Sequence, residues 1–272
     1  MRETVIQAGA APRLALYLKD LWRYRHLIGV FCLRDIKTRY TQTILGVGWV
    51  LLTPLMTVGV FSFVFGLLIK VPSDGLPYLL FYLVAIIPWY AFINTLNNAV
   101  TSIEANSGLI SKIYFPRLLI GASHAVSALV DFMVGYLLII GFAAYFGFLT
   151  FTLFLITPLL LLIQTGFALG IGYFLAPLNT RYRDVKLSVP LAAQLFYYAS
   201  PIMYPSSVAP AWAKPWFNIN PFSVVINGYR KALLGEVFNW PYLLLGLIVS
   251  MIVLAIGAAF FISREQDLVD VL

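Results

Sequence analysis

Long apolar stretches with few interruptions run through almost the whole of this 272-residue chain, and they limit what it can fold into. Hydrophobic residues make up 61% of the sequence and charged residues only 11%, whereas a typical soluble domain carries about 25% charged residues. A water-soluble core has no room for so much apolar surface. Because a helix satisfies its own backbone hydrogen bonds in lipid, the sequence predicts an all-α integral membrane protein.

Six apolar segments are long enough to cross a bilayer, which takes about 20 helical residues. They lie at about 44–69, 79–100, 118–147, 152–176, 187–204 and 241–262. Together they make up a single transmembrane domain of residues 1–272, in which residues 44–262 hold the six spans. We expect an amphipathic helix before the spans, over residues 13–42, and a short cytoplasmic tail after them, over residues 263–272.

The distribution of Lys and Arg predicts how the chain is oriented. With the six spans as given, fourteen of these residues fall on one side of the membrane and four on the other. Cytoplasmic loops are enriched in Lys and Arg, so both termini are expected in the cytoplasm. The net charge of +7 therefore reflects basic residues beside membrane spans, and we exclude nucleic acid as a partner.

The amphipathic segment carries an apolar stripe at helical spacing, which is broken once, at Arg25. The stripe consists of Leu14, Leu18, Leu21, Ile28, Cys32 and Ile36. A basic amphipathic helix of this kind lies in the plane of the lipid headgroups, although a plain basic flank that only orients the first span is the alternative. The residues expected at the inner mouth are Arg34, Lys37, Arg39 and Tyr40.

The cytoplasmic loop EANSGLISKIYFPR, residues 104–117, has features of a short helix. Glu104 near its start and Lys112 near its end suit the helix dipole, and Pro116 would end a helix before the third span. The loop is either a connecting turn or a docking helix for a cytoplasmic partner. The residues that would form the docking surface are Glu104, Asn106, Leu109, Lys112, Phe115, Pro116 and Arg117.

The segment between the last two spans, residues 205–240, is rich in Pro and Trp. Prolines interrupt a continuous span, and Trp favours the membrane interface. The apolar run Phe222–Leu234 is too short to cross and contains two basic residues, so it would re-enter the outer leaflet only where protein shelters it. The sequence predicts re-entrant helices that form an outer gate. The candidate gate residues are Tyr204, Trp212, Trp216, Asn220, Tyr229 and Arg230.

A few polar or small residues inside the spans have informative spacing. One face of the third span carries His124, Ala128, Asp131 and Gly135. Asp131 is costly in lipid and is expected to face the bundle interior. We favour a helix–helix hydrogen bond for it, and a proton relay is the alternative. In the fourth span, Gly166 and Gly170 form a G-x-x-x-G pattern that favours packing within the chain.

No catalytic or nucleotide-binding motif occurs in the sequence, which has no G-x-S-x-G, H-E-x-x-H, P-loop or G-x-G-x-x-G pattern. One cysteine and two histidines exclude a cysteine cluster and a conventional histidine metal site. We therefore expect no enzyme, and no metal or cofactor site on this chain. The competing hypotheses are a membrane glycosyl- or acyltransferase and a proton-coupled carrier that would use His124 and Asp131.

Four motifs in order along the chain resemble the permease subunit of ABC-2 type exporters. Within that family they are similar to the branch that exports polysaccharides such as O-antigen or teichoic acid. The motifs are RDIKTRYTQTILGVGWVLLTPL at 34–55, NSGLISKIYFPR at 106–117, NTRYRDVK at 179–186, and SPIMYP followed by NPFSVVINGYRKALLG at 220–235. The tail REQDLVDVL at 264–272 is a variant of the family ending, with Leu268 and Val269 where Phe and Ala are usual.

This resemblance implies a homodimer that works with two ATPase subunits, and these partners would bind ATP and Mg²⁺. Segment 104–116 would be the coupling helix that docks on the ATPase, segment 13–42 the interface helix at the inner mouth, and segment 205–235 the outer gate. The first and fifth spans of both copies would line the channel. The candidate channel-lining residues are Thr53, Thr57, Phe61, Gln194, Tyr197 and Tyr198.

The implied cargo is a glycan linked to undecaprenyl diphosphate, moved outward across the bacterial cytoplasmic (inner) membrane and surrounded by membrane lipids. Aromatic side chains in the fifth span suit sugar rings, and ordinary packing explains them as well. The basic residues at the inner mouth either attract the diphosphate or bind anionic lipid headgroups. An ABC-2 exporter of a drug or another amphiphile is the alternative. The identity and length of the glycan stay open.

Overall fold

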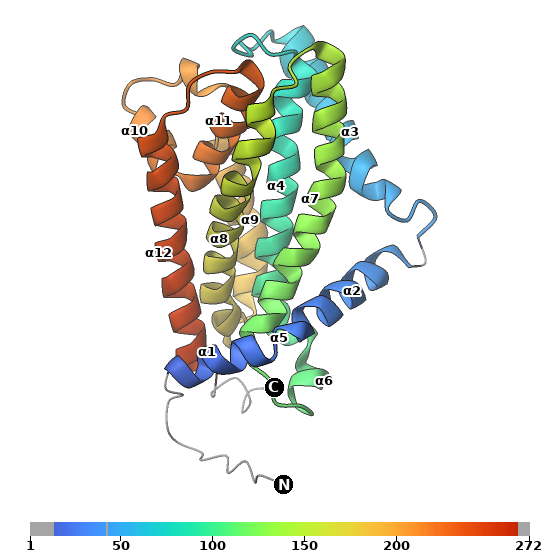
Figure 1. Ribbon diagram of the computed structural model, residues 1–272, viewed down its shortest axis with the longest axis vertical. Helices are drawn as coiled ribbons and strands as arrows, with labels where there is room; N and C mark the ends of the chain where they lie inside the picture. Colours follow the sequence, from blue (N-terminus) through green and yellow to red (C-terminus); the bar gives the residue numbers. More distant parts are fainter. Residues whose placement is uncertain (1–13, 42, 266–272) are drawn as a thin grey trace.

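The computed structural model describes residues 14–41 and 43–265, and every regular element in those ranges is a helix (Figure 1). The N-terminal elements are α1 (Leu14–Arg23), α2 (His26–Tyr40) and α3 (Gly48–Phe61), which continues into the π-helix η1 (Ser62–Leu68). Next come α4 (Tyr78–Val100), α5 (Ser102–Ala105), α6 (Ser107–Ile110), α7 (Leu118–Phe146) and α8 (Phe151–Arg181). The last elements are α9 (Asp184–Ala199), η2 (Ser206–Val208), α10 (Lys214–Ile219), α11 (Pro221–Leu234) and α12 (Trp240–Arg264).

Five helices in the described ranges are long and apolar enough to cross a membrane. They are Gly48–Leu68, Tyr78–Val100, Leu118–Phe146, Phe151–Arg181 and Trp240–Arg264. They agree with five of the six predicted spans and with an all-helical integral membrane protein. The remaining predicted span, 187–204, corresponds to α9, which has only 16 residues. A proline at position 201 disfavours helical geometry in the residue before it, and α9 ends just before that point.

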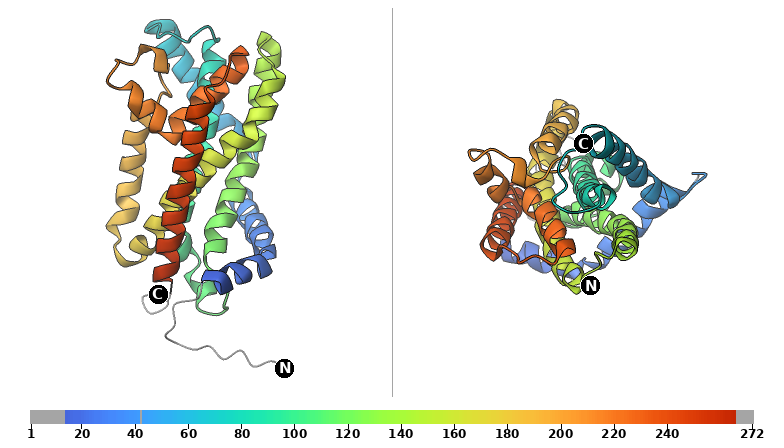
Figure 2. Two further views of the ribbon diagram at one scale, coloured as in Figure 1. Left: turned by 60° about the vertical axis from the view of Figure 1, so that its left-hand side comes forward. Right: turned by 90° about the horizontal axis from the view of Figure 1, so that it is seen from above.

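The helix α4 forms the centre of the bundle (Figure 2, right). Its side chains Phe81, Tyr82 and Phe92 are almost completely buried, among residues of α7, α8 and α11. In contrast, α3 and its continuation η1 leave large apolar side chains such as Met56 of α3 and Phe63 of η1 more than half exposed. Apolar faces of this size require lipid or another subunit to cover them.

The helices α8 and α12 touch through their backbones. A Cβ atom added to Gly257 in α12 would lie 2.0 Å from the carbonyl oxygen of Gly170 in α8, and one added to Gly170 would lie 2.6 Å from the backbone of α12. Gly166, one turn earlier in α8, faces Met251 and Ser250 of α12. The G-x-x-x-G pattern therefore packs within the chain, as the sequence analysis predicted.

The remaining helices gather at the two ends of the bundle (Figure 1). At one end, drawn at the bottom, lie α1, α5, α6 and the end of α12, and α2 slopes upward from there along α7. At the other end, drawn at the top, lie α10 and α11. We call these the lower and the upper end.

Candidate functional site

The predicted amphipathic segment forms two helices, α1 and α2, and not one continuous helix. The chain turns at Tyr24 and Arg25, so the interruption that the sequence shows at Arg25 is a break in the helix. Of the predicted apolar stripe, Cys32 is buried and Leu18 is 54% exposed. The first helix instead buries Tyr17, one residue earlier, in an apolar cluster shared with α7 and α12.

The end of α2 holds Asp131 of α7 in place. Arg39 Nη1 donates to Asp131 Oδ2 at 2.5 Å, and Arg39 Nη2 donates to Ser127 Oγ at 3.1 Å. Tyr40 Oη donates to the other carboxylate oxygen of Asp131 at 2.7 Å. Charge-assisted hydrogen bonds offset the cost of removing a carboxylate from water. Because both carboxylate oxygens are engaged, the geometry favours the helix–helix role of Asp131 over a proton relay.

A second polar contact joins the same two helices nearer the lower end. His124 Nδ1 lies 2.8 Å from Asp35 Oδ2, and the other oxygen of Asp35 accepts from Arg34 Nη2 at 2.9 Å. We call the contacts of Asp35, Arg39 and Tyr40 with α7 the α2–α7 clamp. Sequence reasoning missed Asp35 as a partner. The sequence signal for this pairing was the spacing of the four residues. Asp35 and Arg39 lie four residues apart on one face of α2, and their partners His124 and Asp131 lie seven residues apart on one face of α7.

The clamp also decides which basic residues of the predicted inner mouth are available to a ligand. Arg39 is engaged by Asp131. The side chain of Arg34 is 43% exposed although it pairs with its neighbour Asp35, and Lys37 is exposed. The structure therefore separates a positioning residue, Arg39, from two cations that face outward.

A cavity of about 400 Å³ adjoins the clamp between α3, α4 and α7. Arg39, Tyr40 and Asp131 form one side of it, and Thr53 of α3 and Asn94 of α4 form part of the other. Thr53 was predicted to line the channel, and Arg39 and Tyr40 to lie at its inner mouth. The structure brings these two predicted sets together around one cavity.

Three further predicted channel residues meet over α4. The ring of Phe61, near the end of α3, lies 6.4 Å from that of Tyr197 in α9, measured between centroids. The Tyr197 ring in turn lies 5.0 Å from Trp89 of α4. Thr57 Oγ1 lies 3.0 Å from Tyr90 Oη, one turn below. The helices α3, α4 and α9 thus share a face that combines aromatic rings with hydroxyl groups.

The last two predicted channel residues, Gln194 and Tyr198, lie on α9 and are exposed. So is a row of leucines at helical spacing on the same helix, Leu187, Leu191 and Leu195, each more than 60% exposed. One side of α9 is therefore buried against the bundle, while the other is largely apolar and uncovered. We call the exposed parts of α3 and α9, together with the aromatic residues between them, the α3–α9 face.

The predicted docking segment is not a single helix. It forms the one-turn helices α5 and α6 at the lower end, and they separate at Asn106, whose Nδ2 donates to the carbonyl oxygen of Ser102 at 2.9 Å. Phe115 and Pro116 are buried and Leu109 is half-buried, so these residues support the segment from inside. The residues that face outward include Lys112 and the missed pair Ile113 and Tyr114, which are 58% and 66% exposed.

Two acidic side chains, Glu104 and Glu265, tie this segment to other helices. Lys186 Nζ of α9 lies 2.5 Å from Glu104 Oε1, and Asn179 Nδ2 of α8 donates to the other carboxylate oxygen at 3.3 Å. The hydrogen bond from Lys186 holds the pKa of Glu104 below its ordinary value. At the far end of the segment, the backbone N–H of Arg117 donates to Glu265 Oε1 at 2.9 Å. Burial raises the pKa of Glu265 even so.

At the upper end, Asn220 begins α11. Its Oδ1 accepts from the backbone N–H groups of Phe222 at 3.0 Å and Ser223 at 3.4 Å, and Pro221 fills the first helical position, where no N–H is needed. Asn220 Nδ2 also donates to Ser200 Oγ at 3.2 Å. A single side chain thus caps α11 and fixes it to the segment that follows α9.

Arg230 of α11 is 5% exposed and has carbonyl groups as partners. Its guanidinium donates to the carbonyl oxygens of Ile202 at 3.2 Å and Tyr204 at 3.4 Å. It also lies 3.6 Å from the ring centroid of Phe81 in α4, a favourable position for a cation. Arg230 therefore holds the 202–204 loop between α4 and α11.

The other predicted gate residues divide into buried and exposed ones. Tyr229 is completely buried, whereas Trp212 and Trp216 are 83% and 52% exposed. Trp216 Nε1 donates to the carbonyl oxygen of Ala199 at 3.2 Å, and the hydroxyl of Tyr204 donates to another carbonyl of α9 at 3.0 Å. The upper end is thus a packed unit with an aromatic outer edge, and its opening and closing stays a prediction.

Within residues 14–41 and 43–265, no group of three or more His, Cys, Asp or Glu side chains could hold a metal ion. What the structure offers instead is a bundle of long apolar helices, with the ion-paired helix α2 and the α5–α6 segment toward its lower end. These features define a multi-pass membrane protein.

Comparison with known proteins identifies the family. The ABC-2 type transporter family matches residues 26–234, and the chain belongs to it. Within this family it is the membrane permease subunit and not the catalytic one, so the resemblance seen in the sequence motifs is confirmed.

Similar proteins cover almost the whole chain. The O-antigen export system permease protein RfbA of Klebsiella pneumoniae is 28% identical over 247 residues, which make up 90% of this chain and 95% of the relative. RfbA of Myxococcus xanthus is 25% identical over 93% of this chain and 98% of the relative. The polysialic acid transport protein KpsM of Escherichia coli is 26% identical over 86% and 92%.

Proposed function

We propose that this chain is the permease subunit of an exporter that moves a lipid-linked polysaccharide, of the O-antigen or teichoic-acid type, out of the bacterial cytoplasm. The single observation that supports this most is the similarity to O-antigen export permeases over 90% of the chain. The energy comes from ATP, hydrolysed with Mg²⁺ by a partner ATPase. The cargo is a glycan on undecaprenyl diphosphate.

The chain crosses the inner membrane six times, with α9 as the sixth crossing segment. A helix of 16 residues is about 24 Å long, somewhat less than the ~30 Å hydrocarbon core, and the re-entrant α10–α11 unit completes the crossing at the upper end. The lower end is cytoplasmic because the basic residues of the chain gather there. Both termini are then on the cytoplasmic side.

Two copies form the channel by facing each other across their α3–α9 faces. The exposure of this face supports the arrangement, because only 17% of the apolar window in Gly48–Leu68 is buried, against 78% in α4. Thr53, Thr57, Phe61 and Tyr197 then lie along the path of the polar headgroup and glycan. The lipid tail stays in the bilayer, and the upper-end residues act as the outer gate.

The α5–α6 segment docks on the ATPase through its exposed residues, among them Lys112 and Tyr114. Glu104 and Arg117 anchor the segment to α9 and to the end of α12. A movement of the ATPase at this loop therefore reaches the channel-lining helix α9 directly. Arg34 and Lys37 face outward and attract the diphosphate at the inner mouth.

The test follows lipid-linked glycan in cells depleted of this chain, by metabolic labelling and membrane fractionation. We expect undecaprenyl-linked polymer to accumulate on the cytoplasmic leaflet while surface polymer disappears. Complete loss of polymer would instead point to a synthetic enzyme. Normal surface polymer combined with new sensitivity to toxic compounds would favour an ABC-2 exporter of a drug or another amphiphile.

A further inference from the structure

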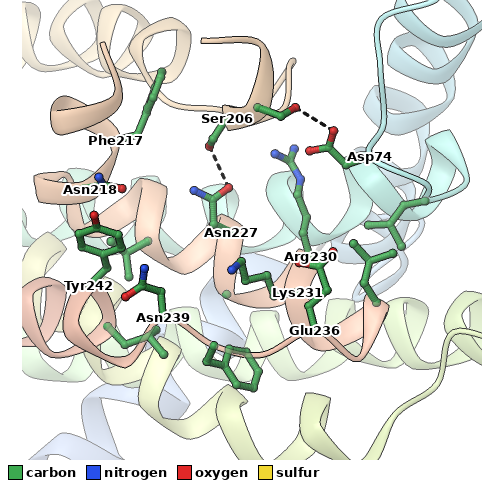
Figure 3. A pocket seen from close by; sticks show the side chains of 17 residues that line it. Asp74, Ser206, Phe217, Asn218, Asn227, Arg230, Lys231, Glu236, Asn239 and Tyr242 are labelled. Atoms are coloured by element: carbon green, nitrogen blue, oxygen red, sulfur yellow. Dashed lines mark hydrogen bonds between the residues drawn. The ribbon is translucent and has the colours of Figure 1, made fainter. Parts of the chain in front are cut away.

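A second cavity, of about 530 Å³, lies at the upper end, away from the α3–α9 face. Figure 3 shows it between α10, α11, the start of α12 and the loop at Asp74. Its volume is typical of small-molecule sites, which measure about 300–1,000 Å³. None of the predicted channel residues lines it, so it is a separate site from the proposed channel.

Three asparagines from three elements surround this cavity. They are Asn218 of α10, Asn227 of α11 and Asn239, which precedes α12. Asn227 Oδ1 accepts from Ser206 Oγ at 3.0 Å, and the NH₂ group of this amide has no side-chain partner within the described residues. The amides of Asn218 and Asn239 make no side-chain hydrogen bond within the described residues. An amide both donates and accepts, as a sugar hydroxyl does.

Aromatic side chains complete the lining. Tyr242 lies across the cavity from Asn227 in Figure 3, with 39% of the residue exposed. Phe217 is buried in the wall, and Phe238 also contributes. An aromatic surface with a few placed polar groups gives a site both affinity and orientation. The C–H faces of a pyranose ring fit such a surface.

The charges of the cavity argue against an anionic ligand. Its two basic lining residues already have backbone partners, since Arg230 donates to Ile202 and Tyr204, and Lys231 Nζ lies 3.4 Å from the carbonyl oxygen of Val237. The two acidic lining residues, Asp74 and Glu236, are exposed. Asp74 Oδ1 accepts from Ser207 Oγ at 2.8 Å, and carboxylates are good acceptors for hydroxyl donors. A neutral polyhydroxyl ligand matches this lining better than a phosphate does.

We propose that this upper-end cavity binds a saccharide unit, recognised by the three asparagines and stacked on Tyr242. The inference rests on the proposed export of a polysaccharide and deepens it. A sugar site on the outer side of α11 gives the emerging chain a place to bind once it has passed the gate. It thereby disfavours return of the glycan into the channel.

The test uses the full chain in lipid nanodiscs and saturation-transfer difference NMR. The probes are D-mannose, D-galactose, N-acetyl-D-glucosamine and D-glucose, because this method detects millimolar binding. We expect saturation transfer to at least one sugar. It should fall about fivefold or more in Tyr242→Ala and in Asn239→Ala, since each change removes a contact of about 1 kcal/mol.

Tyr145→Ala is the matched control. Tyr145 is 81% exposed at the upper end of α7 and is absent from the cavity lining, so its loss should leave the signal unchanged. Signals no stronger than those of empty nanodiscs, or an equal loss in all three variants, would overturn the sugar site. If depletion of the chain blocks export but no sugar binds, the proposed function stands and the cavity assignment fails. If sugar binds but depletion of the chain causes no export defect, the cavity assignment stands and the proposed function fails.

Discussion

The two ends of the molecule are held together by different interactions. In the lower half, several contacts between helices far apart in sequence are ion pairs, such as Arg39 with Asp131 and Lys186 with Glu104. At the upper end, hydrogen bonds that form no ion pair predominate, such as Asn220 with Ser200 and Ser207 with Asp74, and the buried Arg230 bonds to carbonyl groups. The lower end thus joins separate helices by contacts that can break one at a time, while the upper end is a single packed unit.

The largest effect is expected at the close backbone contact between α8 and α12. Gly257→Val would drive a side chain into the carbonyl oxygen of Gly170, which lies 2.0 Å from the added Cβ. Overpacking typically costs about 1–3 kcal/mol and occasionally more. We expect a cost at the upper limit here, because backbone atoms cannot move aside as a side chain can, and therefore a reduced folded peak in size-exclusion profiles of detergent extracts. Gly141→Val in α7 is the control, because no atom lies within 4 Å of its added Cβ. Equal profiles for the two variants would contradict the close α8–α12 contact.

The next effect concerns the α2–α7 clamp. Asp131→Leu leaves Arg39 without its carboxylate in a partly buried site. Breaking a fully buried pair costs about 3–5 kcal/mol, and the loss here should be smaller because the Arg39 side chain is 32% exposed. The double variant Arg39→Met/Asp131→Leu removes both charges, so it should recover at least half of that loss. Thermal unfolding of the three purified proteins measures both quantities. A double variant no more stable than Asp131→Leu would show that the unpaired Arg39 carries no cost.

The same variants also distinguish a structural role of Asp131 from a role as a proton relay. The double variant should keep its export activity with an unchanged pH profile, because α2 stays docked on α7 through apolar contacts. A proton-coupled carrier would lose transport in every variant that lacks the carboxylate, including this one. Surface polymer, quantified in cells at two external pH values, distinguishes the two outcomes.

Arg230 tests the upper end. Arg230→Lys keeps the charge but loses the planar fork that reaches the carbonyl oxygens of Ile202 and Tyr204. We expect a loss of about 1–2 kcal/mol, read as a lower unfolding temperature and faster proteolysis between residues 202 and 208. Lys214→Arg at an exposed position is the control. The loss should be the same at low and high salt, because the site is buried.

The sequence predicts those features of the structure that depend on residues close together in the chain, and it misses those that depend on contacts between distant segments. Apolar length gives five spans to within a few residues, and the proline after Ser200 explains why α9 is shorter than predicted. The break at Arg25 was visible as an interruption of the stripe. The burial of Tyr17 in place of Leu18 was not, because it depends on which neighbours α1 meets.

The candidate sites show the same limit. A carboxylate exposed to lipid is energetically costly, so the sequence could assign Asp131 to the bundle interior. It could not identify the partners Arg39 and Tyr40, because they are about 90 residues away in sequence. The docking segment could be located from its charges, while its split at Asn106 depends on one side-chain-to-backbone hydrogen bond. The upper-end cavity is formed by residues from four separate segments, and no local pattern joins them.

The smallest effect on stability is expected at the ion pair between Glu104 and Lys186, which are 49% and 38% exposed. Exposed pairs contribute at most about 1 kcal/mol, so Glu104→Lys should lower the unfolding temperature only slightly. The difference should vanish in 1 M salt, where charges are screened within about 3 Å. The part of the difference that comes from the ion pair should also be lost as the pH falls through the lowered pKa of Glu104, because the folded state then loses the carboxylate that Lys186 stabilises. Only the repulsion between Lys186 and the lysine introduced by Glu104→Lys then remains.

The same pair matters more for transport if the α5–α6 segment moves α9. Glu104→Lys should then uncouple the partner ATPase from export, so that ATP hydrolysis continues while surface polymer falls severalfold. The exchange Glu104→Lys/Lys186→Glu restores the pair with reversed polarity and should restore export. Export that stays low in the exchanged variant, with stability and ATPase binding intact, would mean that Glu104 acts on the ATPase and not on α9. The lower end would then transmit motion through Arg117 and the end of α12 instead.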